Sequence, residues 1–351
     1  MSPSGSDDQI QHVGSRPNPN VAVIGAGIAG LTAARALQAK GLSVTVFEKS
    51  RGPSGRMSTR RSDGSIQFDH GAQYFTARDP SFQRIVRTWE EAGLVNRWKA
   101  RFGVITHDGF ISEEPRATRW VGSPRMSVLC RNLSQGLILK TSTRIGAMRR
   151  AGTSWLLQDD AQRDLGSFDE VIVAVPAAQA APLLTPAPSF ASIASSTDMA
   201  PCQTLMLAFP RPLNLPLDAA RVQEGPLAWV ARDSSKPGRP PGERWVAQAT
   251  PESSTEHLEE TASETVTRLL SAFQSVTGNH TPPSHAVAHR WRYARTVGSH
   301  DAGPPALYDS ALHLGVAGDW LIGARVEAAW QSGVAVAERL LGSTSSAEGS
   351  P

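Results

Sequence analysis

The chain contains 351 residues, 40% of them hydrophobic and 19% charged, a composition typical of a globular protein with room for two domains. Its formal net charge of +3 is too small to indicate a nucleic-acid partner. No apolar run approaches the roughly eighteen residues that suggest a membrane-spanning helix. The two cysteines, Cys130 and Cys202, provide neither a disulfide framework nor a metal-ligand spacing. We therefore expect a cytoplasmic protein without a metal site.

The first periodic segment predicts a complete βαβ unit. An apolar strand over residues 21–24 ends in a GxGxxG pattern at residues 25–30, which continues into a helix-like stretch over residues 31–40. A second strand over residues 42–47 is followed directly by Glu48. A glycine-rich turn between a strand and a helix, with an acidic residue after the next strand, is the pattern of a dinucleotide-binding fold.

Each position of this pattern has a physical role. Gly25 permits the tight turn, Gly27 lets the backbone approach a pyrophosphate, and Gly30 allows the helix and the strand to pack closely. The N-terminus of the helix offers free N–H groups and a positive dipole to the phosphates. Glu48 can accept hydrogen bonds from the ribose hydroxyls, so we predict that the chain binds a nucleotide cofactor.

Two further segments, at opposite ends of the chain, favour FAD over a nicotinamide cofactor. In residues 54–60 (SGRMSTR), Arg56 can offer its fork of donors to the pyrophosphate. Residues 314–320 (LGVAGDW) predict a strand that ends at Asp319, whose carboxylate can bind the ribityl chain or a phosphate-bound water. The helix that begins near Val326 can point N–H groups at the flavin edge that becomes negative on reduction.

We expect FAD to be held without a covalent bond, because neither cysteine lies near the C-terminal motif. The expected cofactor-binding residues come from the βαβ unit, the loop around Arg56, two internal segments and the C-terminal motif. They are Gly25, Gly27, Ile28, Ala29, Gly30, Glu48, Lys49, Gly55, Arg56, Met57, Ile145, Ala174, Gly318, Asp319, Arg325 and Val326.

The segments that suit a nucleotide-binding fold are separated along the chain. We therefore predict an α/β protein that combines a discontinuous Rossmann-type FAD-binding domain with an α+β substrate domain containing a mixed or antiparallel sheet. The predicted division assigns residues 20–69, 123–185 and 308–342 to the FAD-binding domain, residues 70–122 and 186–307 to the substrate domain, and residues 1–19 and 343–351 to a disordered leader and tail. The Pro- and Gly-rich residues 234–242 predict an exposed hairpin loop.

Several motifs together resemble the renalase-type branch of the flavin amine-oxidase superfamily. They are GRMSTR at residues 55–60, FDHGAQYFTAR at 68–78, WVARDSSKPGR at 229–239, HRWRYA at 289–294, AGDW at 317–320 and RVE at 325–327. The first and the last two are shared by the wider superfamily. The stretches around His70 and Trp291 are more specific to the branch, and the motifs together span nearly the whole chain.

The resemblance implies non-covalent FAD in a fold like that of p-hydroxybenzoate hydroxylase. It also implies a substrate that is itself a dihydronicotinamide. Renalases oxidise isomers of NAD(P)H that carry the extra hydrogen at ring carbon 2 or 6, return NAD(P)⁺ and pass the electrons to O2, which yields hydrogen peroxide. The expected partners are therefore this small substrate and O2, with no nucleic acid and no membrane, in a monomer or weak dimer.

Oxidation of such a dihydropyridine restores an aromatic ring and needs no strong base. The protein must stack the donor carbon about 3–3.5 Å from flavin N5. The aromatic residues that suit such a wall are Tyr74, Phe75, Trp291 and Tyr293. We expect Trp291, Gln248, Tyr74 and His70 to form the catalytic site.

Three of these expectations rest on the chemistry of single residues. Gln248 stands where relatives often have His, and it can hydrogen-bond a carboxamide but cannot act as an acid or a base. His70 either hydrogen-bonds the flavin or the substrate, or has a structural role in its Gly-Ala turn. Arg290 and Arg292 alternate with Trp291 on a strand, so they should face away from it and form salt bridges.

Other functions remain open on the same scaffold. Amine oxidases usually place a lysine near flavin N5, whereas the middle of this chain offers only Lys99 and Lys236, the second in the expected surface loop. This argues against simple amine oxidation. The alternatives are a flavin amine oxidase, an FAD monooxygenase, or a non-catalytic FAD-binding module.

Overall fold

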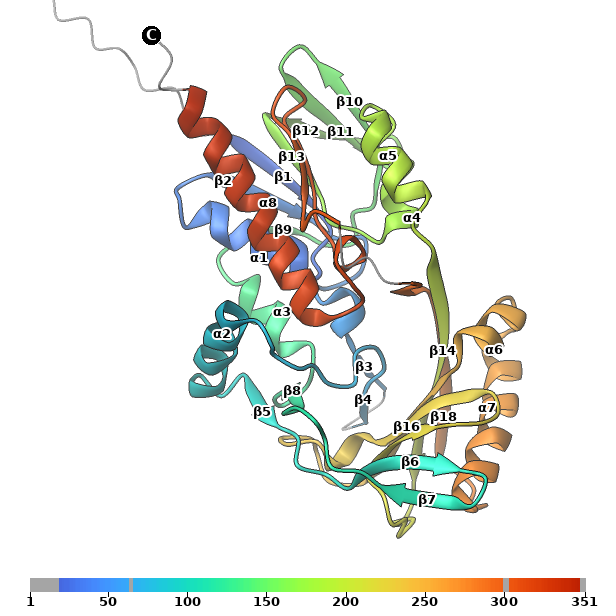
Figure 1. The fold of residues 1–351 in the computed structure, drawn as a ribbon. Coiled ribbons are helices and arrows are strands. Elements are labelled where there is room, and N and C mark those ends of the chain that lie inside the picture. Colours follow the sequence, from blue (N-terminus) through green and yellow to red (C-terminus); the bar gives the residue numbers. More distant parts are fainter. Residues whose placement is uncertain (1–18, 63–65, 299–302, 348–351) are drawn as a thin grey trace, which may run out of the picture.

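A six-stranded sheet forms the nucleotide-binding half of the molecule (Figure 1). The computed structural model describes residues 19–62, 66–298 and 303–347, so residues 1–18 of the predicted leader and the last four residues of the predicted tail lie outside it. The strand order is β19-β20-β13-β1-β2-β9, and every pair is parallel except β19–β20. These strands are β1 (Asn20–Ile24), β2 (Ser43–Phe47), β9 (Ile138–Lys140), β13 (Glu170–Val173), β19 (Leu307–Asp309) and β20 (Leu314–Val316).

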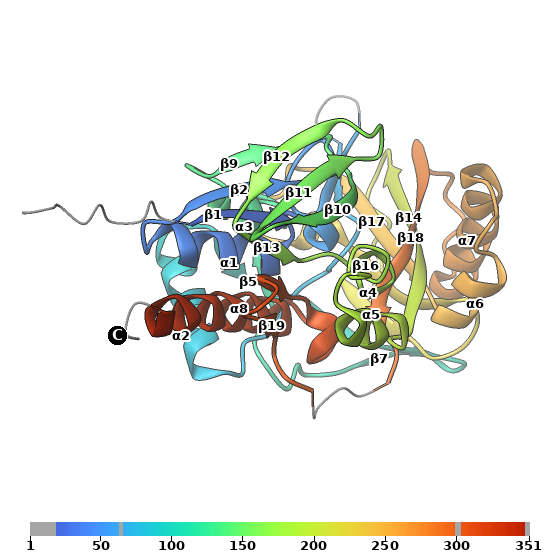
Figure 2. The same ribbon diagram turned by 90° about the horizontal axis from the view of Figure 1, so that it is seen from above.

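Layers of different kinds cover the two faces of this sheet (Figure 2). Helices pack on the face that presents Val21 and Val23 of β1, and the opposite face, with Ala22 and Ile24, packs against a three-stranded sheet. β1 is therefore apolar on both sides, as expected for a central parallel strand. The helices are α1 (Ile28–Gln38), α3 (Val128–Leu133) and α8 (Val326–Ala347); the opposite layer contains β10 (Ile145–Ala151), β11 (Ser154–Asp159), β12 (Asp164–Phe168), α4 (Ala177–Ala180) and α5 (Pro188–Ser195).

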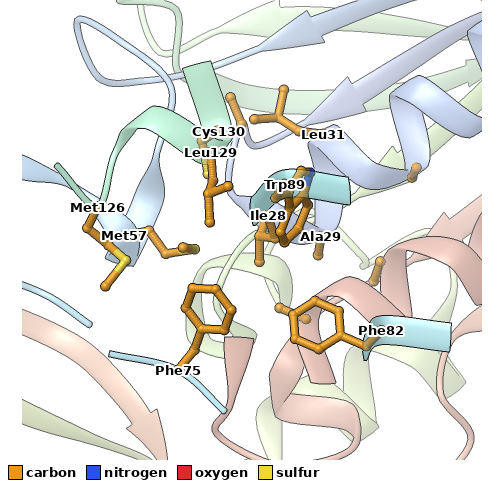
Figure 3. Close-up of a cluster of buried hydrophobic side chains, with 14 of the residues drawn as sticks. Ile28, Ala29, Leu31, Met57, Phe75, Phe82, Trp89, Met126, Leu129 and Cys130 are labelled. Carbon is orange, nitrogen blue, oxygen red and sulfur yellow. The ribbon is translucent and has the colours of Figure 1, made fainter. Parts of the chain in front are cut away.

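The core beside α1 also includes α2 (Pro80–Glu91) (Figure 3). Ile28 of α1, Phe82 of α2 and Leu129 of α3 belong to the same buried cluster. Buried Glu327, in the first turn of α8, accepts hydrogen bonds from the backbone N–H groups of Arg78 (2.6 Å) and Asp79 (2.7 Å) and so ties α2 to α8. The structure thus places α2 and α5 against the nucleotide-binding half, whereas the predicted division assigned both to the substrate domain.

The second half is built on a seven-stranded sheet in the order β18-β14-β17-β16-β15-β6-β7. Its pairs are antiparallel except for β15–β6, so the sheet is mixed, which is one of the two forms predicted. α6 (Pro251–Glu256) and α7 (Ala262–Thr277) cover its outer face (Figure 1). The strands are β6 (Phe102–Thr106), β7 (Gly109–Ser112), β14 (Met199–Phe209), β15 (Ala219–Val222), β16 (Leu227–Arg232), β17 (Glu243–Ala249) and β18 (His285–Thr296).

Short elements complete the chain. They are the pairs β3 (Thr59–Arg61) with β4 (Gln67–Asp69) and β5 (Val95–Arg97) with β8 (Trp120–Gly122), and the 3₁₀ turns η1 (Gly55–Met57), η2 (Asp233–Ser235) and η3 (Asp319–Leu321). α8 continues to Ala347, so the first five residues of the predicted disordered tail, 343–347, are helical. In the described part of the chain, no helix combines the length and apolarity needed to cross a membrane.

Candidate active site

The glycine-rich turn has two tight positions and one open one. Gly25 has φ +109°, and a Cβ there would lie 2.4 Å from the carbonyl oxygen of Ala174. A Cβ on Gly30 would lie 2.1 Å from the carbonyl oxygen of Gly25. A Cβ on Gly27 would meet nothing within 4 Å, and no side chain caps α1 at this residue. Space and uncapped N–H groups at this helix start are what a pyrophosphate requires.

Glu48 lies beside this turn at the end of β2. Its carboxylate is buried and accepts hydrogen bonds from the backbone N–H groups of Ala26 (2.9 Å) and Ser50 (2.8 Å). A carboxylate has further lone pairs for ribose hydroxyls. Together with the open position at Gly27, this donor and acceptor set fits the ADP half of FAD.

Arg56 and Asp319 bind each other in the structure. The guanidinium donates to the two carboxylate oxygens over 2.9 Å and 2.5 Å, and also to the carbonyl of Ala294 in β18 over 3.1 Å. We expected Arg56 to offer a free fork to the pyrophosphate, but it uses that fork on Asp319. The pair joins the N-terminal and C-terminal motifs to the edge of the seven-stranded sheet.

The other expected cofactor residues lie around this frame. Ile28 and Ala29 form the first turn of α1, and Val326 begins α8. Met57 and Ile145 are buried, in η1 and at the start of β10, and Arg325 is exposed. A Cβ on Gly55 would lie 3.3 Å from Gly27 Cα. Lys49 donates a hydrogen bond to Gln179 over 3.2 Å, and the Gly318 N–H donates one to Ser332 over 2.8 Å.

In the second half of the molecule, a row of side chains crosses the seven-stranded sheet. The register pairs Trp229 with Gln248, Gln248 with Thr204, and Thr204 with His289, across β16, β17, β14 and β18. Directly paired residues share a face, and so do residues two apart on one strand. Trp291 therefore joins the same face as His289. Helices α6 and α7 cover the opposite face.

The turn at His70 and Gly71 lies against this row. The Trp291 indole N–H donates to the carbonyl of His70 over 3.0 Å, and Gln248 Nε2 donates to the carbonyl of Gly71 over 2.8 Å. The His70 ring stacks on Trp291 with centroids 5.0 Å apart and meets His289 edge-on at 4.7 Å. Three of the four expected catalytic residues, Trp291, Gln248 and His70, thus meet at this turn, together with His289.

The His70–Gly71 turn also contacts the backbone of Arg56, one of the expected cofactor-binding residues. The Ala72 N–H donates to the Arg56 carbonyl over 2.9 Å, and a Cβ on Gly71 would lie 2.0 Å from that oxygen. Gly71 is required here because the two backbones approach so closely. The row on the sheet and the Arg56–Asp319 pair are therefore connected through one turn.

Both imidazoles in this cluster are neutral at ordinary pH. Burial, the nearby His289 and Arg60 lower the pKa of His70 to about 3. Burial and the positive charge of Arg60 lower the pKa of His289 to about 4. His70 Nδ1 is buried and has no hydrogen-bond partner among the described residues. Neutral imidazoles can donate or accept hydrogen bonds without adding charge to the site.

The remaining aromatic candidates separate into two groups. Tyr74 packs against Trp229 with ring centroids 5.7 Å apart, at the far end of the row. Tyr293 is half-buried two residues beyond Trp291. Phe75 is buried in the hydrophobic core beside Phe82, so it is not part of a substrate wall.

Lys236 corrects one of our expectations. Residues 234–242 join the antiparallel strands β16 and β17 as the predicted hairpin loop does, and Gly238, Pro241 and Gly242 are exposed, but the Lys236 side chain is fully buried. Its ammonium lies 2.7 Å from Asp233 Oδ1, 3.2 Å from Gln73 Oε1 and 3.7 Å from Asp69 Oδ2. Buried Arg239 also contacts Asp69. Lys236 is therefore a member of an internal ion cluster.

The arginines beside Trp291 behave as predicted. Arg290 and Arg292 lie on the opposite side of β18 and form salt bridges with Glu259 at 3.2 Å and 2.7 Å. Sequence reasoning missed His289 and Trp229 as members of the row. The two-residue spacing of His289 and Trp291 could have identified His289. Trp229 is placed by the pairing of β16 with β17, which no local pattern indicates.

Comparison with known proteins identifies the family of the chain. A model of the flavin-containing amine oxidoreductases matches residues 104–341, more than half of the chain, and a model of an NAD(P)-binding Rossmann-like domain matches residues 23–89. The chain belongs to the flavin-containing amine oxidoreductase family. This family member is an FAD-dependent oxidoreductase, as the glycine-rich and C-terminal motifs predicted.

Solved structures share the fold of this flavin oxidoreductase over nearly its whole length. The structure named for a protoporphyrinogen oxidase from Exiguobacterium sp. 255-15 has a TM-score of 0.73 at 13% identity, covering 93% of this chain and 99% of that one. Cyclohexylamine oxidase from Brevibacterium oxydans IH-35A has a TM-score of 0.70 at 13% identity, with coverages of 95% and 100%. At these identities the likeness concerns the fold alone.

Curated relatives match shorter segments. The tRNA 5-methylaminomethyl-2-thiouridine biosynthesis bifunctional protein MnmC of Magnetococcus marinus is 31% identical over 213 residues, which are 49% of this chain and 31% of that protein. Protoporphyrinogen oxidase 2 of Arabidopsis thaliana is 40% identical over 106 residues, 30% of this chain and 19% of that protein. The chain thus spans less than a third of the length of these two relatives.

Proposed function

We propose that this enzyme is an oxidase of isomeric dihydronicotinamide dinucleotides, the 2- or 6-dihydro forms of NAD(P), and that it belongs to the renalase-like branch. The observation that carries the proposal is the neutral, aromatic and hydrogen-bonding cluster of His70, His289, Trp291 and Gln248. Bound FAD supplies a hydride acceptor. Loss of hydride from a dihydropyridine creates an aromatic cation, so the protein must position the ring without deprotonating it.

Trp291 is built as a rigid wall. Its N–H is held by the His70 carbonyl, and its ring is packed by both imidazoles, at centroid distances of 5.0 Å and 4.5 Å. A planar ring stacked on this indole keeps a fixed orientation because the indole itself has little freedom. We assign to Trp291 the role of orienting the nicotinamide ring toward the cofactor side.

One polar atom of the Gln248 side chain forms a hydrogen bond, and the other has no partner among the described residues. Its Nε2 donates to the Gly71 carbonyl, whereas its Oε1 accepts no hydrogen bond from the described residues. An amide oxygen can accept the N–H of a carboxamide. We propose that Gln248 and His70 recognise the nicotinamide carboxamide and ring, and that Tyr74 forms the outer end of the same wall.

The main alternative is amine oxidation, which the names of the structural neighbours suggest. An alkylammonium must lose a proton before its hydride becomes transferable, and imidazoles with pKa values of about 3 and about 4 are weak bases. The buried Lys236 is committed to Asp233 and Gln73. These observations favour the dihydropyridine.

The test is anaerobic bleaching of the flavin by a panel of donors. The panel contains the 2- and 6-dihydro isomers of NAD and NADP, ordinary 4-dihydro-NADPH, and common amines. We expect an isomer to bleach the flavin fastest, to yield NAD(P)⁺, and to give hydrogen peroxide when air is admitted. Faster bleaching by an amine would establish the amine oxidase instead. Steady consumption of ordinary NADPH would indicate a monooxygenase, and a flavin that no donor bleaches would indicate a non-catalytic module.

The mode of FAD binding, the location and the oligomeric state are proposals of the same kind. We propose that FAD is bound without a covalent bond, so acid precipitation should release it into the supernatant. A cytoplasmic location and a monomeric or weakly dimeric state complete the proposal, and sedimentation of the purified holoenzyme measures the second.

A further inference from the structure

A cluster of aromatic rings surrounds Arg119 at the outer end of the row. The guanidinium carbon lies 3.9 Å from the Phe102 ring centroid, 4.7 Å from that of Tyr74 and 5.8 Å from that of Trp229. Trp98 packs beside Tyr74 at 6.4 Å. Rings hold a guanidinium plane through their negative faces, but they provide no acceptor for its N–H groups.

Two hydrogen-bond donors in this cluster lack an acceptor. Arg119 Nη1 and Trp229 Nε1 are both buried, and neither has a hydrogen-bond partner among the described residues. The nearby carboxylate of Glu113 is bonded to Arg221 over 2.7 Å. Burial lowers the pKa of Arg119, and Tyr74 and Glu113 oppose this shift only in part. Buried donors left unpaired are costly, so this arrangement suits a ligand that brings acceptors and negative charge.

The cluster continues the proposed substrate wall. Trp229 is the register partner of Gln248, and Tyr74 lies three residues after Gly71, whose carbonyl Gln248 binds. The cluster therefore lies at the β16 end of the same row, one strand beyond Gln248.

We propose that Arg119 and Trp229 form a subsite for an anionic oxygen group of the substrate, a phosphate or a carboxylate. The identification of this group as the pyrophosphate of a dihydronicotinamide dinucleotide rests on the proposed function. A guanidinium at this position repels ammonium substrates, so the subsite also selects against amines.

The proposal predicts a selective loss of substrate affinity. Arg119→Gln should raise KM for the 6-dihydro-NADP isomer at least tenfold with kcat nearly unchanged, since the charge is remote from the reacting carbon. KM for 1-methyl-1,6-dihydronicotinamide, which has the same ring and no phosphate, should change less than twofold. Trp229→Phe, which keeps a ring and removes the donor, should raise KM for the dinucleotide severalfold. Equal effects on both substrates, or no effect on either, would overturn the subsite.

Arg116→Gln is the matched control. Arg116 is exposed in the same segment, and its replacement changes the net charge by the same amount. It should change neither KM more than twofold. A change as large as that of Arg119→Gln would assign the effect to general electrostatics and overturn the proposal.

A binding measurement separates this inference from the proposed reaction. If the wild-type holoenzyme oxidises neither substrate, the proposed function fails, and the subsite is then tested with inorganic pyrophosphate and with benzoate by tryptophan fluorescence. We expect pyrophosphate to bind the wild type and to bind Arg119→Gln at least tenfold more weakly. Arg119-dependent binding of benzoate alone would overturn the pyrophosphate assignment in favour of a carboxylate, and binding that is unchanged by Arg119→Gln would overturn the subsite.

Discussion

The seven-stranded sheet has two faces made from alternating residues of the same strands, and the two faces contact different parts of the molecule. The face toward α7 presents Leu205 and Trp245, which are fully buried and pack against Phe273. The face toward the nucleotide-binding half presents Gln248 and Trp291, which are half-buried and hydrogen-bonded to the His70–Gly71 turn.

The difference between the faces indicates that one face mainly stabilises the fold and the other mainly serves the reaction. We call the face toward α7 the closed face and the face toward the nucleotide-binding half the open face. The closed face buries its apolar surface against helices of the same half of the molecule, so it can stabilise the fold without a cofactor. The open face carries polar and aromatic groups against a turn that connects to the Arg56–Asp319 pair. Substitutions on the closed face should therefore lower stability, whereas substitutions on the open face should lower turnover.

Phe273→Ala tests the closed face and should have the largest effect. The Phe273 ring is fully buried, 5.7 Å from Trp245 and 6.2 Å from Phe209. We expect the free energy of unfolding in urea to fall by roughly 3–5 kcal/mol, with flavin reduction by folded protein unchanged. Ile193→Ala, at a 40% exposed position on α5, is the control and should cost less than about 0.5 kcal/mol. A loss below about 1 kcal/mol for Phe273→Ala would remove the distinction between the faces.

Gly27→Val tests whether FAD binds to the nucleotide-binding half, which faces the open face of the sheet. Position 27 has φ −79° and no atom within 4 Å of a Cβ, so the variant should fold normally. We expect FAD affinity to fall by about a hundredfold or more, because the side chain occupies the space beside the helix start. Glu48→Ala should cost about 1.5–3 kcal/mol of FAD binding through its lost hydrogen bonds. Flavin content after gel filtration measures both, and full loading of either variant would show that FAD lies elsewhere.

Trp291→Ala tests the open face directly. We expect flavin reduction by the dihydropyridine isomer to slow about tenfold, a loss of about 1.4 kcal/mol, because the stacking wall is removed. FAD content should be unchanged. Arg292→Ala, one residue along β18 and on the opposite side, should change the rate less than twofold. Equal effects of the two variants would show that the faces are not functionally distinct.

The last test concerns pH. The imidazoles of His70 and His289 have folded pKa values of about 3 and about 4, below the unfolded value of about 6.5. Between these limits the unfolded chain binds more protons than the folded one, so stability should rise with pH from about 4 to about 6.5. Urea unfolding at pH 4.5, 5.5 and 7 measures the slope, and His289→Gln should reduce it. A slope of opposite sign, or one unchanged in the variant, would contradict the neutral imidazole pair.

Much of the cofactor side could be predicted from the sequence. The βαβ unit, its glycines and Glu48 are contiguous, and their roles follow from backbone geometry that local residues impose. The C-terminal helix and the outward-facing Arg290 and Arg292 were also predictable, since each depends on short-range periodicity.

The sequence was less informative where charged residues are buried. Residues 234–242 have the composition of an exposed turn, yet Lys236 is buried because Asp69 and Asp233 compensate its charge. Nothing local showed that Arg56 and Asp319 would form an ion pair, and their assignment to the cofactor stays a prediction. The cluster around Arg119 likewise brings together rings from β6, β16 and the loop at Tyr74.

The sequence by itself determined the elements whose conformation depends on near neighbours: the glycine turn, the strand that places Glu48, and the alternation that puts His289 with Trp291. Only the tertiary structure decided which side chains share the substrate face, because strand order pairs Trp229, Gln248 and His289 across distant segments. Strand order and charge pairing arise from long-range packing, and no local pattern of residues encodes them.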